Sequence, residues 1–280
     1  MSGIRTYFYA TLTDMNQLTP TPPPATGSLN RASILLTAIA RGSRKGSLLT
    51  EIVARTSLPR PTIHRTMDML IKMGWVERDS ATRRYNLGHA LAVLGYSAIN
   101  RHRLEAIAAP VLSALAVQLK HVVYLQVRDG LDTVCIGRYE SGIVNPDEKG
   151  QVGFRGPLGM SPSCTAMFAY LPATEIEHII KANLSRYHRI EGFDETGFRN
   201  VVKDALEKGY GTYDNIILNR ILSAFAVAIR DESGYPIAAV AMTYEHEKST
   251  AAERSTFLAT LKNATLQIQE EITKAKLNDH

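Results

Sequence analysis

Apolar residues recur at helical spacing from Ser28 onward, as in the series Leu29, Leu35 and Ile39. This spacing indicates amphipathic helices. Gly74 is placed to end the last of them, and a polar turn after it separates two short β-rich runs. The pattern predicts helices over 28–39, 48–56 and 60–73, followed by strands over 75–78 and 84–87.

The pattern changes after residue 88. Residues 89–119 are rich in Ala and Leu at helical spacing, with Pro110 as an interruption, and they predict a helical connector. Beyond it the sequence predicts strands over 122–127, 133–139, 151–155, 223–230 and 236–243, and helices over 163–171, 174–184, 194–208 and 250–276. Strands at both ends with helices between them are typical of an α+β domain built on an antiparallel sheet.

The first 27 residues show neither periodicity. The run 19–24 contains four prolines and favours extended conformations, and the short apolar stretch before it does not fit a signal peptide. We therefore expect four parts: a disordered extension over 1–27, a helical domain with a hairpin over 28–88, a helical linker over 89–104 and an α+β domain over 105–280.

Charge is distributed unevenly along the chain. The net charge is +5, yet residues 28–100 hold 11 Lys and Arg against 4 Asp and Glu, whereas residues 101–280 hold 20 against 22. A small basic module joined to a neutral domain is typical of nucleic-acid binding. The alternative is a solvated basic face that has no partner.

Two short helices separated by a three- or four-residue turn, the second of them basic, indicate a helix-turn-helix. The hairpin after Gly74 would be its wing. The second helix would lie in the major groove, and the wing would follow a phosphate backbone or enter a minor groove. The candidate DNA-binding residues are Arg44, Lys45, Arg60, Thr62, His64, Arg65, Arg83 and Arg84.

Simpler roles remain open for several of these residues. His64 can be an ordinary surface histidine, and Arg65 can pair with Asp68 or Glu77 instead of DNA. Trp75 is expected in the core under the wing. The prediction of DNA binding therefore depends on the coincidence of charge, helix-turn-helix and wing, not on one residue.

Composition excludes several protein classes. No apolar run approaches the roughly 20 residues of a membrane span, and the two cysteines, Cys135 and Cys164, fit no disulfide or zinc framework. We expect a cytoplasmic protein without cofactor or metal. Cys164, His178 and Asp194 can be named as a triad, but no catalytic motif supports it, and no catalytic residue is expected.

Residues 28–88 resemble the N-terminal domain of the IclR family of bacterial transcription regulators. The matching motifs are 28–32, 58–65, 74–76 and 84–88, and weaker ones follow at 157–159, 208–210 and 230–231. Pro61 departs from the pattern, because it stands where the family often has a small hydroxyl residue; proline suits the first turn of a helix but removes one phosphate donor.

The resemblance implies a winged helix-turn-helix joined to a GAF-like α+β domain that binds a small effector, often an organic acid, and shares in oligomerisation. Gly159-Met160-Ser161 precedes a helix, whose first amides suit a carboxylate. Ser161 or Ser163 can equally be a simple helix cap. The resemblance places further effector-site residues at Asp214, at Ser223 or Ala224, and at Thr243. Ala241 stands where some relatives have serine, which implies a more apolar site. Arg155 and Arg220 are candidates for the counter-charge, although each can be an ordinary surface arginine.

The sequence thus predicts a DNA-binding transcription regulator controlled by a small organic or aromatic acid. It would bind double-stranded operator DNA as a homodimer or homotetramer, since two half-sites raise affinity and specificity. One alternative is an enzyme that acts on a small acid and is tethered to nucleic acid by its N-terminal domain. Another is an architectural repressor without an effector.

Overall fold

A computed structural model describes residues 27–40, 42–43, 45–56, 58–102, 104–142, 152–190, 193–213 and 222–277. The chain divides into two compact units, and the boundary between them in the sequence falls between Arg103 and Leu104. Each unit is described by itself. The extension expected to be disordered, apart from Gly27, lies outside the described residues.

The N-terminal unit contains three helices, a hairpin and a fourth helix, in the order expected from the pattern of apolar residues. They are α2 (Ser28–Ala40), α3 (Leu49–Arg55), α4 (Arg60–Lys72), β1 (Val76–Arg78), β2 (Tyr85–Leu87) and α5 (His89–His102). The core is formed by one side of α2, α3 and α4 together with hairpin residues, and it includes Leu35, Ile52, Ile63 and Met67. Gly74 ends α4 in the left-handed region, at φ +69°.

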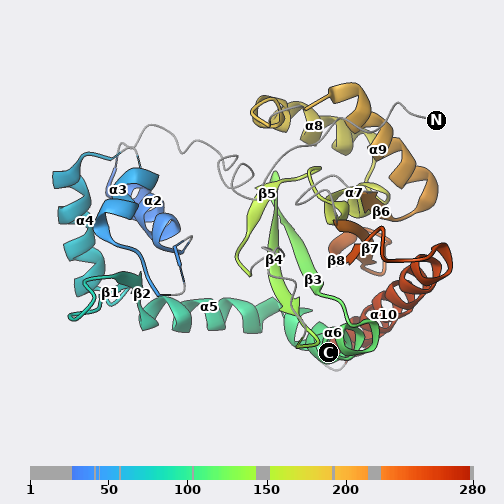
Figure 1. Ribbon diagram of the computed structural model, residues 1–280, viewed down its shortest axis with the longest axis horizontal. Helices are drawn as coiled ribbons and strands as arrows, with labels where there is room; N and C mark the ends of the chain where they lie inside the picture. Colours follow the sequence, from blue (N-terminus) through green and yellow to red (C-terminus); the bar gives the residue numbers. More distant parts are fainter. Residues whose placement is uncertain are drawn as a thin grey trace. The chain divides into compact units, whose positions relative to one another are not determined.

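The C-terminal unit is built on one six-stranded antiparallel sheet with the order β5-β4-β3-β8-β7-β6 (Figure 1). Its strands are β3 (Val123–Asp129), β4 (Asp132–Tyr139), β5 (Arg155–Pro157), β6 (Gly211–Tyr213), β7 (Leu222–Arg230) and β8 (Pro236–Glu245). Both predicted hairpins form, and β3 pairs with β8 to join them. The strand expected over 151–155 lies instead at 155–157, and β6 was not predicted.

Helices cover both faces of this sheet. They are α6 (Leu104–Leu119), α7 (Pro162–Phe168), α8 (Ala173–Tyr187), α9 (Glu195–Lys208) and α10 (Ala251–Leu277). Helices α6 and α10 pack on one face, and α7, α8 and α9 lie on the side of the other (Figure 1). No helix in the described part of the chain is long and apolar enough to cross a membrane.

The two faces carry side chains of different size. On β7 and β8, the face below α7 presents alanines, which we call the alanine face: Ala224, Ala226, Ala228, Ala239 and Ala241. The opposite, bulky face presents Phe225, Val227, Ile229, Val240 and Met242 to α6 and α10. Small side chains let α7 lie close to the sheet: a β-carbon added to Gly211 in β6 would meet the Pro162 carbonyl oxygen at 2.0 Å.

Candidate DNA-binding and effector-binding sites

Helix α4 presents basic side chains on the side opposite its core residues. Pro59 and Pro61 fix the start of the helix, since proline suits its first turn. Arg60, His64 and Arg65 are exposed, and Thr62 is half-buried. The first turns of a helix held in this way can enter a major groove with these side chains against base edges.

The sequence left open an ion pair between Arg65 and Glu77, but Glu77 bonds elsewhere in the structure. Its carboxylate oxygen Oε1 accepts a hydrogen bond from the His89 amide at 3.0 Å and so stabilises the start of α5. Trp75 is half-buried and packs against the core of this unit, as expected.

The wing is closed by a tight turn. The Asp79 carboxylate accepts hydrogen bonds from the amides of Thr82 and Ala81, at 2.6 and 3.0 Å. The hydrogen bond from Thr82 is the main cause that lowers the pKa of Asp79. Arg83 follows at φ +56° and is exposed. The turn therefore holds one of the two predicted arginines at the tip, toward solvent.

Arg84, the second predicted wing arginine, is engaged within the unit. Its Nη1 donates to the Gly46 carbonyl oxygen at 2.8 Å and lies 3.7 Å from Oε2 of Glu51. Its side chain is half-buried, and it links the wing to the turn before α3. Lys45 in that turn is exposed, whereas Arg44 lies outside the described residues.

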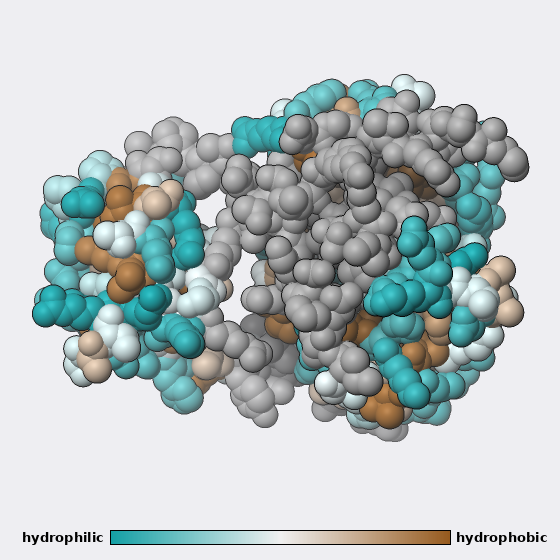
Figure 2. Space-filling model, viewed as in Figure 1, coloured by the Kyte–Doolittle hydropathy of each residue, from teal (hydrophilic) through white to brown (hydrophobic). Residues whose placement is uncertain are grey.

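Arg78 was not among the predicted DNA-binding residues. It is an exposed residue of β1, and its guanidinium carbon lies 5.5 Å from the centroid of the Tyr85 ring. Its place on the first strand of a predicted wing was the available signal. Figure 2 shows apolar patches between hydrophilic residues on the N-terminal unit. Met69 and Met73 are among its exposed apolar side chains.

In the C-terminal unit, the loop before α7 is anchored by three side chains. The Tyr213 hydroxyl donates to the Gly159 carbonyl oxygen at 2.8 Å, the Tyr187 hydroxyl donates to that of Leu158, and Asn183 Nδ2 reaches the same Leu158 oxygen at 3.5 Å. Gly159 adopts φ +113°, and an added β-carbon would lie 2.7 Å from the Tyr187 hydroxyl oxygen. Met160, the next residue, is buried.

Of the two roles open for Ser161, the structure has it as the cap of α7. Its Oγ accepts from the Cys164 amide at 3.4 Å and lies 3.4 Å from Oε1 of Gln126 on β3, to which it can donate. The Ser163 hydroxyl is buried and has no hydrogen-bond partner among the described residues. Of the two serines, Ser161 therefore makes hydrogen bonds in the structure, whereas the Ser163 hydroxyl makes none among the described residues.

The sheet register separates the remaining effector-site candidates. Thr243 pairs with Ala224 and lies on the alanine face, below α7. Ser223 lies on the bulky face, where its Oγ is 3.2 Å from Nδ1 of His246. Of the two neighbouring positions left open by the resemblance, the alanine and not the serine shares a face with Thr243. Asp214 lies outside the described residues.

Arg155 is occupied by carboxylates and does not face this site. Its Nη1 bonds Asp132 at 2.9 Å, and its Nη2 contacts Asp129. The nearly buried Asp132 also pairs with Arg186 at 2.6 Å, so these residues tie β4 and β5 to α8. Arg220 lies outside the described residues.

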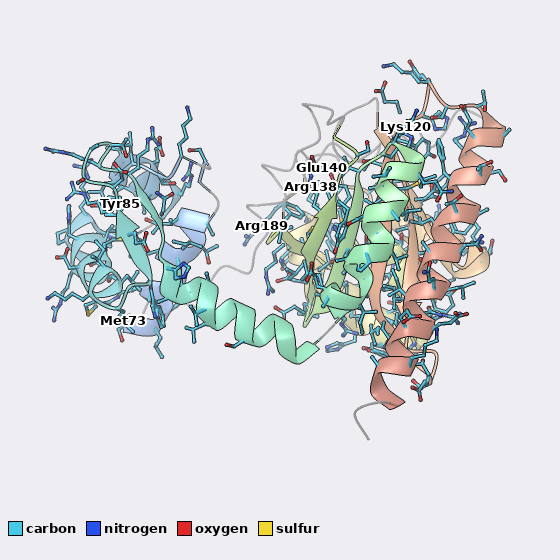
Figure 3. The ribbon with its side chains drawn as sticks, turned by 90° about the horizontal axis from the view of Figure 1, so that it is seen from below. Met73, Tyr85, Lys120, Arg138, Glu140 and Arg189 are labelled. Carbon is cyan, nitrogen blue, oxygen red and sulfur yellow. The ribbon has the colours of Figure 1, made fainter. Side chains whose placement is uncertain are left out.

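A cation that the sequence analysis missed does face the alanine side. Arg138 on β4 stands opposite Tyr124 on β3, which in turn stands opposite Ala241 on β8. The available signal was a charged residue at an inward position of a strand that alternates between the two faces. Figure 3 labels Arg138 and its neighbour Glu140 at the end of this strand.

The three residues of the named triad have other surroundings. Cys164 is fully buried, and burial raises the pKa of its thiol, which disfavours the reactive thiolate. Asp194 caps α9 with both carboxylate oxygens, and His178 is exposed on α8. Within the described residues, no group of three or more His, Cys, Asp or Glu side chains could hold a metal ion.

Family models match both units. Residues 28–80 match the IclR helix-turn-helix domain, and residues 96–270 match the C-terminal domain of the bacterial transcriptional regulator IclR. The second match alone covers more than half of the chain.

Individual proteins agree with these matches. The chain is 31% identical to the HTH-type transcriptional regulator KipR of Bacillus subtilis over 48% of this chain and 52% of KipR. It is 27% identical to the glycerol operon regulatory protein of Streptomyces coelicolor over 77% of this chain and 84% of that protein. The first alignment thus spans about half of its relative, and the second most of it.

Solved structures share the fold. The IclR transcriptional regulator of Alicyclobacillus acidocaldarius matches with a TM-score of 0.72 at 21% identity, over 87% of this chain and 98% of that chain. An IclR homologue of Microbacterium hydrocarbonoxydans, crystallised with 4-hydroxybenzoate, matches with a TM-score of 0.70 at 21% identity, over 89% of this chain and 100% of that chain. The chain belongs to the IclR family of bacterial transcriptional regulators.

Proposed function

We propose that the protein binds operator DNA through α4 and the wing, and that a small organic acid bound in the C-terminal unit changes this binding. As a member of the IclR family, it is a ligand-responsive DNA-binding transcription regulator. The observation that carries the DNA interface is the exposed basic side of α4, which lies in the same unit as a wing with an exposed arginine at its tip.

The DNA-contacting residues form two groups. Arg60, Thr62, His64 and Arg65 on α4 read base edges and nearby phosphates, and Lys45 and Arg83 contact the phosphate backbone. Arg44 is also proposed to contact the phosphate backbone, and this assignment depends only on the sequence. We assign Arg84 to holding the wing in place, because its guanidinium already bonds Gly46.

We further propose that residues 89–104 form the linker between the DNA-binding domain and the effector-binding domain. The protein acts as a homodimer or homotetramer. One winged unit offers few base contacts. Two copies on related half-sites supply the affinity and specificity of an operator.

The effector site lies on the alanine face, between the loop Gly159–Ser161 and Thr243, with Asp214 added from the sequence. The hydroxyls of Ser161 and Thr243 supply hydrogen bonds that can orient a ligand. The fold is shared with a homologue crystallised with 4-hydroxybenzoate, which favours an organic or aromatic acid. Ser223 is left out, because it lies on the bulky face.

Operator binding by the full chain tests the assignment. DNA fragments would be selected from a random pool, and their affinity would be measured by fluorescence anisotropy for the wild type, Arg65→Ala and Arg199→Ala. Arg199 is a half-buried helical arginine of α9, with 40% of its side chain exposed, and serves as the control. We expect Arg65→Ala to cost about 1–3 kcal/mol at selected sequences and the control to leave affinity unchanged. An equal loss in both variants, or none in either, contradicts the interface.

A second experiment tests the effector on the same selected DNA. Titration with benzoate and 4-hydroxybenzoate should change the affinity of the wild type for its selected DNA. Binding of DNA that no small acid alters would favour a constitutive repressor instead.

A further inference from the structure

Arg138 is held at an inward position of the sheet, over an aromatic ring. Its guanidinium carbon lies 5.8 Å from the centroid of the Tyr124 ring, and 14% of its side chain is exposed. Tyr124 itself is 6% exposed and belongs to the core cluster that includes residues of α7. A guanidinium above an aromatic ring, with little water around it, attracts an anion more strongly than one at the surface.

Glu140 supplies a counter-charge to Arg138. One of its carboxylate oxygens contacts Nε of Arg138, and the two labelled side chains lie beside each other in Figure 3. The Glu140 side chain is 33% exposed, more than twice as much as that of Arg138. Because Glu140 lies just beyond the last residue of β4, its carboxylate can leave the arginine for solvent at small cost.

The register brings Arg138 toward the proposed effector site. Arg138 and Thr243 face the same side of the sheet, two strands apart and in neighbouring rows, with Tyr124 between them. Adjacent strands are about 4.8 Å apart and successive residues on one face about 7 Å apart, so the Cα atoms of Arg138 and Thr243 are separated by about 12 Å. A ligand the size of one aromatic ring with a carboxylate can bridge the guanidinium and the Thr243 hydroxyl.

Resting on the function proposed above, we propose that Arg138 receives the carboxylate of the effector and that Glu140 is a resident counter-ion which the effector displaces. The ligand class is then a monocarboxylate. A second negative charge close to the first would meet Glu140 and is disfavoured. Arg138, and not Arg155 with its two carboxylate partners, is the counter-charge of the site.

Calorimetry on the full-length protein tests this assignment. The probes are benzoate and 4-hydroxybenzoate, each with its uncharged amide, and the variants are Arg138→Met and Glu140→Gln. Arg128→Met is the matched control: Arg128 is also a strand arginine paired with a glutamate, 2.5 Å away, and its side chain is 23% exposed. Circular dichroism and affinity for selected DNA report whether each variant folds.

We expect Arg138→Met to weaken acid binding about 10- to 100-fold, the range for hydrogen bonds to a charged group, and to leave amide binding nearly unchanged. The wild-type preference for acid over amide should then disappear. Glu140→Gln should strengthen acid binding about threefold or more, since it removes the competing anion, and Arg128→Met should behave as wild type. A merely structural role for Arg138 would weaken acid and amide alike.

Two results overturn the proposal. One is an Arg138→Met variant that folds, binds DNA and keeps its preference for the acids. The other is a wild type that binds neither acid at millimolar concentration. The regulator assignment fails separately, through loss of selective DNA binding in the wild type, so the two failures are distinguishable.

Discussion

The two faces of the six-stranded sheet are made by the same strands, yet they have opposite designs. Along β7 and β8, Ala226 and Ala241 pair on one face while Phe225 and Met242 pair on the other. The large side chains of the bulky face fill the space below α6 and α10, and their burial stabilises the fold. The side chains of the alanine face are small and bury less apolar surface, and they allow α7, its capped loop and polar side chains to lie close to the sheet. The proposed effector site therefore lies on residues that alternate, along the same strands, with the large residues of the bulky face.

The strongest test of this division is Phe225→Ala on the bulky face. Phe225 is 8% exposed and stacks on Tyr244 with ring centroids 5.0 Å apart. Its truncation should lower the free energy of unfolding by about 3–5 kcal/mol, measured by urea denaturation. Affinity for a small acid, measured on the folded fraction, should stay within twofold of wild type. A large loss of ligand affinity would show that the faces are not separate.

The reciprocal change, Ala226→Val, adds volume to the alanine face. Ala226 is fully buried in the cluster that contains residues of α7, so two extra methyl groups should displace the helix and cost about 1–3 kcal/mol of stability. We expect it to reduce acid binding, unlike Phe225→Ala. Val227→Ala on the bulky face is its matched control, since it moves the same volume in the opposite direction at the next residue. Unaltered acid binding in Ala226→Val would place the effector elsewhere.

Sequence periodicity predicted the elements whose patterns are long or well marked. Helix α4 and its end at Gly74 were predicted, because apolar spacing and a left-handed glycine both act locally. Strand β6, from Gly211 to Tyr213, was missed, because three residues cannot display a period and no turn marks it, as the polar turn marks β1 and β2. The pairing of β3 with β8 was not foreseen either, since it joins residues more than a hundred positions apart.

The site residues were harder to predict than the fold. A shift of one residue along a strand changes the face, and this puts Ser223 and Ala224 on opposite faces of the sheet. As arginines, Arg84 and Arg155 were candidates for binding an anion. In the structure they bond Gly46 and Asp132, which lie in other parts of the chain. No local pattern contains such contacts. Arg138 was detectable only by assigning a face to each residue of β4.

A smaller effect is expected from removing single hydroxyls. Thr243→Val should weaken acid binding by about 0.5–1.5 kcal/mol, the contribution of a neutral hydrogen bond. Ser223→Ala, on the bulky face, should leave acid affinity unchanged, although it removes the contact with His246. Calorimetry of both variants decides the matter, and a loss of affinity in Ser223→Ala alone would reverse the assignment of the faces.

The smallest effect concerns the thiols on the alanine side. Cys135 is buried there, and burial raises the pKa of its thiol to about 11. Iodoacetamide reacts with the thiolate. At pH 8 a much smaller fraction of Cys135 is therefore ionised than of an ordinary thiol, whose pKa is near 8.5. Alkylation of the native protein, followed by mass spectrometry, should therefore be slow at pH 8 and should accelerate toward pH 11, whereas the urea-unfolded chain should react quickly at pH 8. Rapid native labelling of Cys135 would mean that the core below α7 opens readily, and the close packing of this face would have to be abandoned.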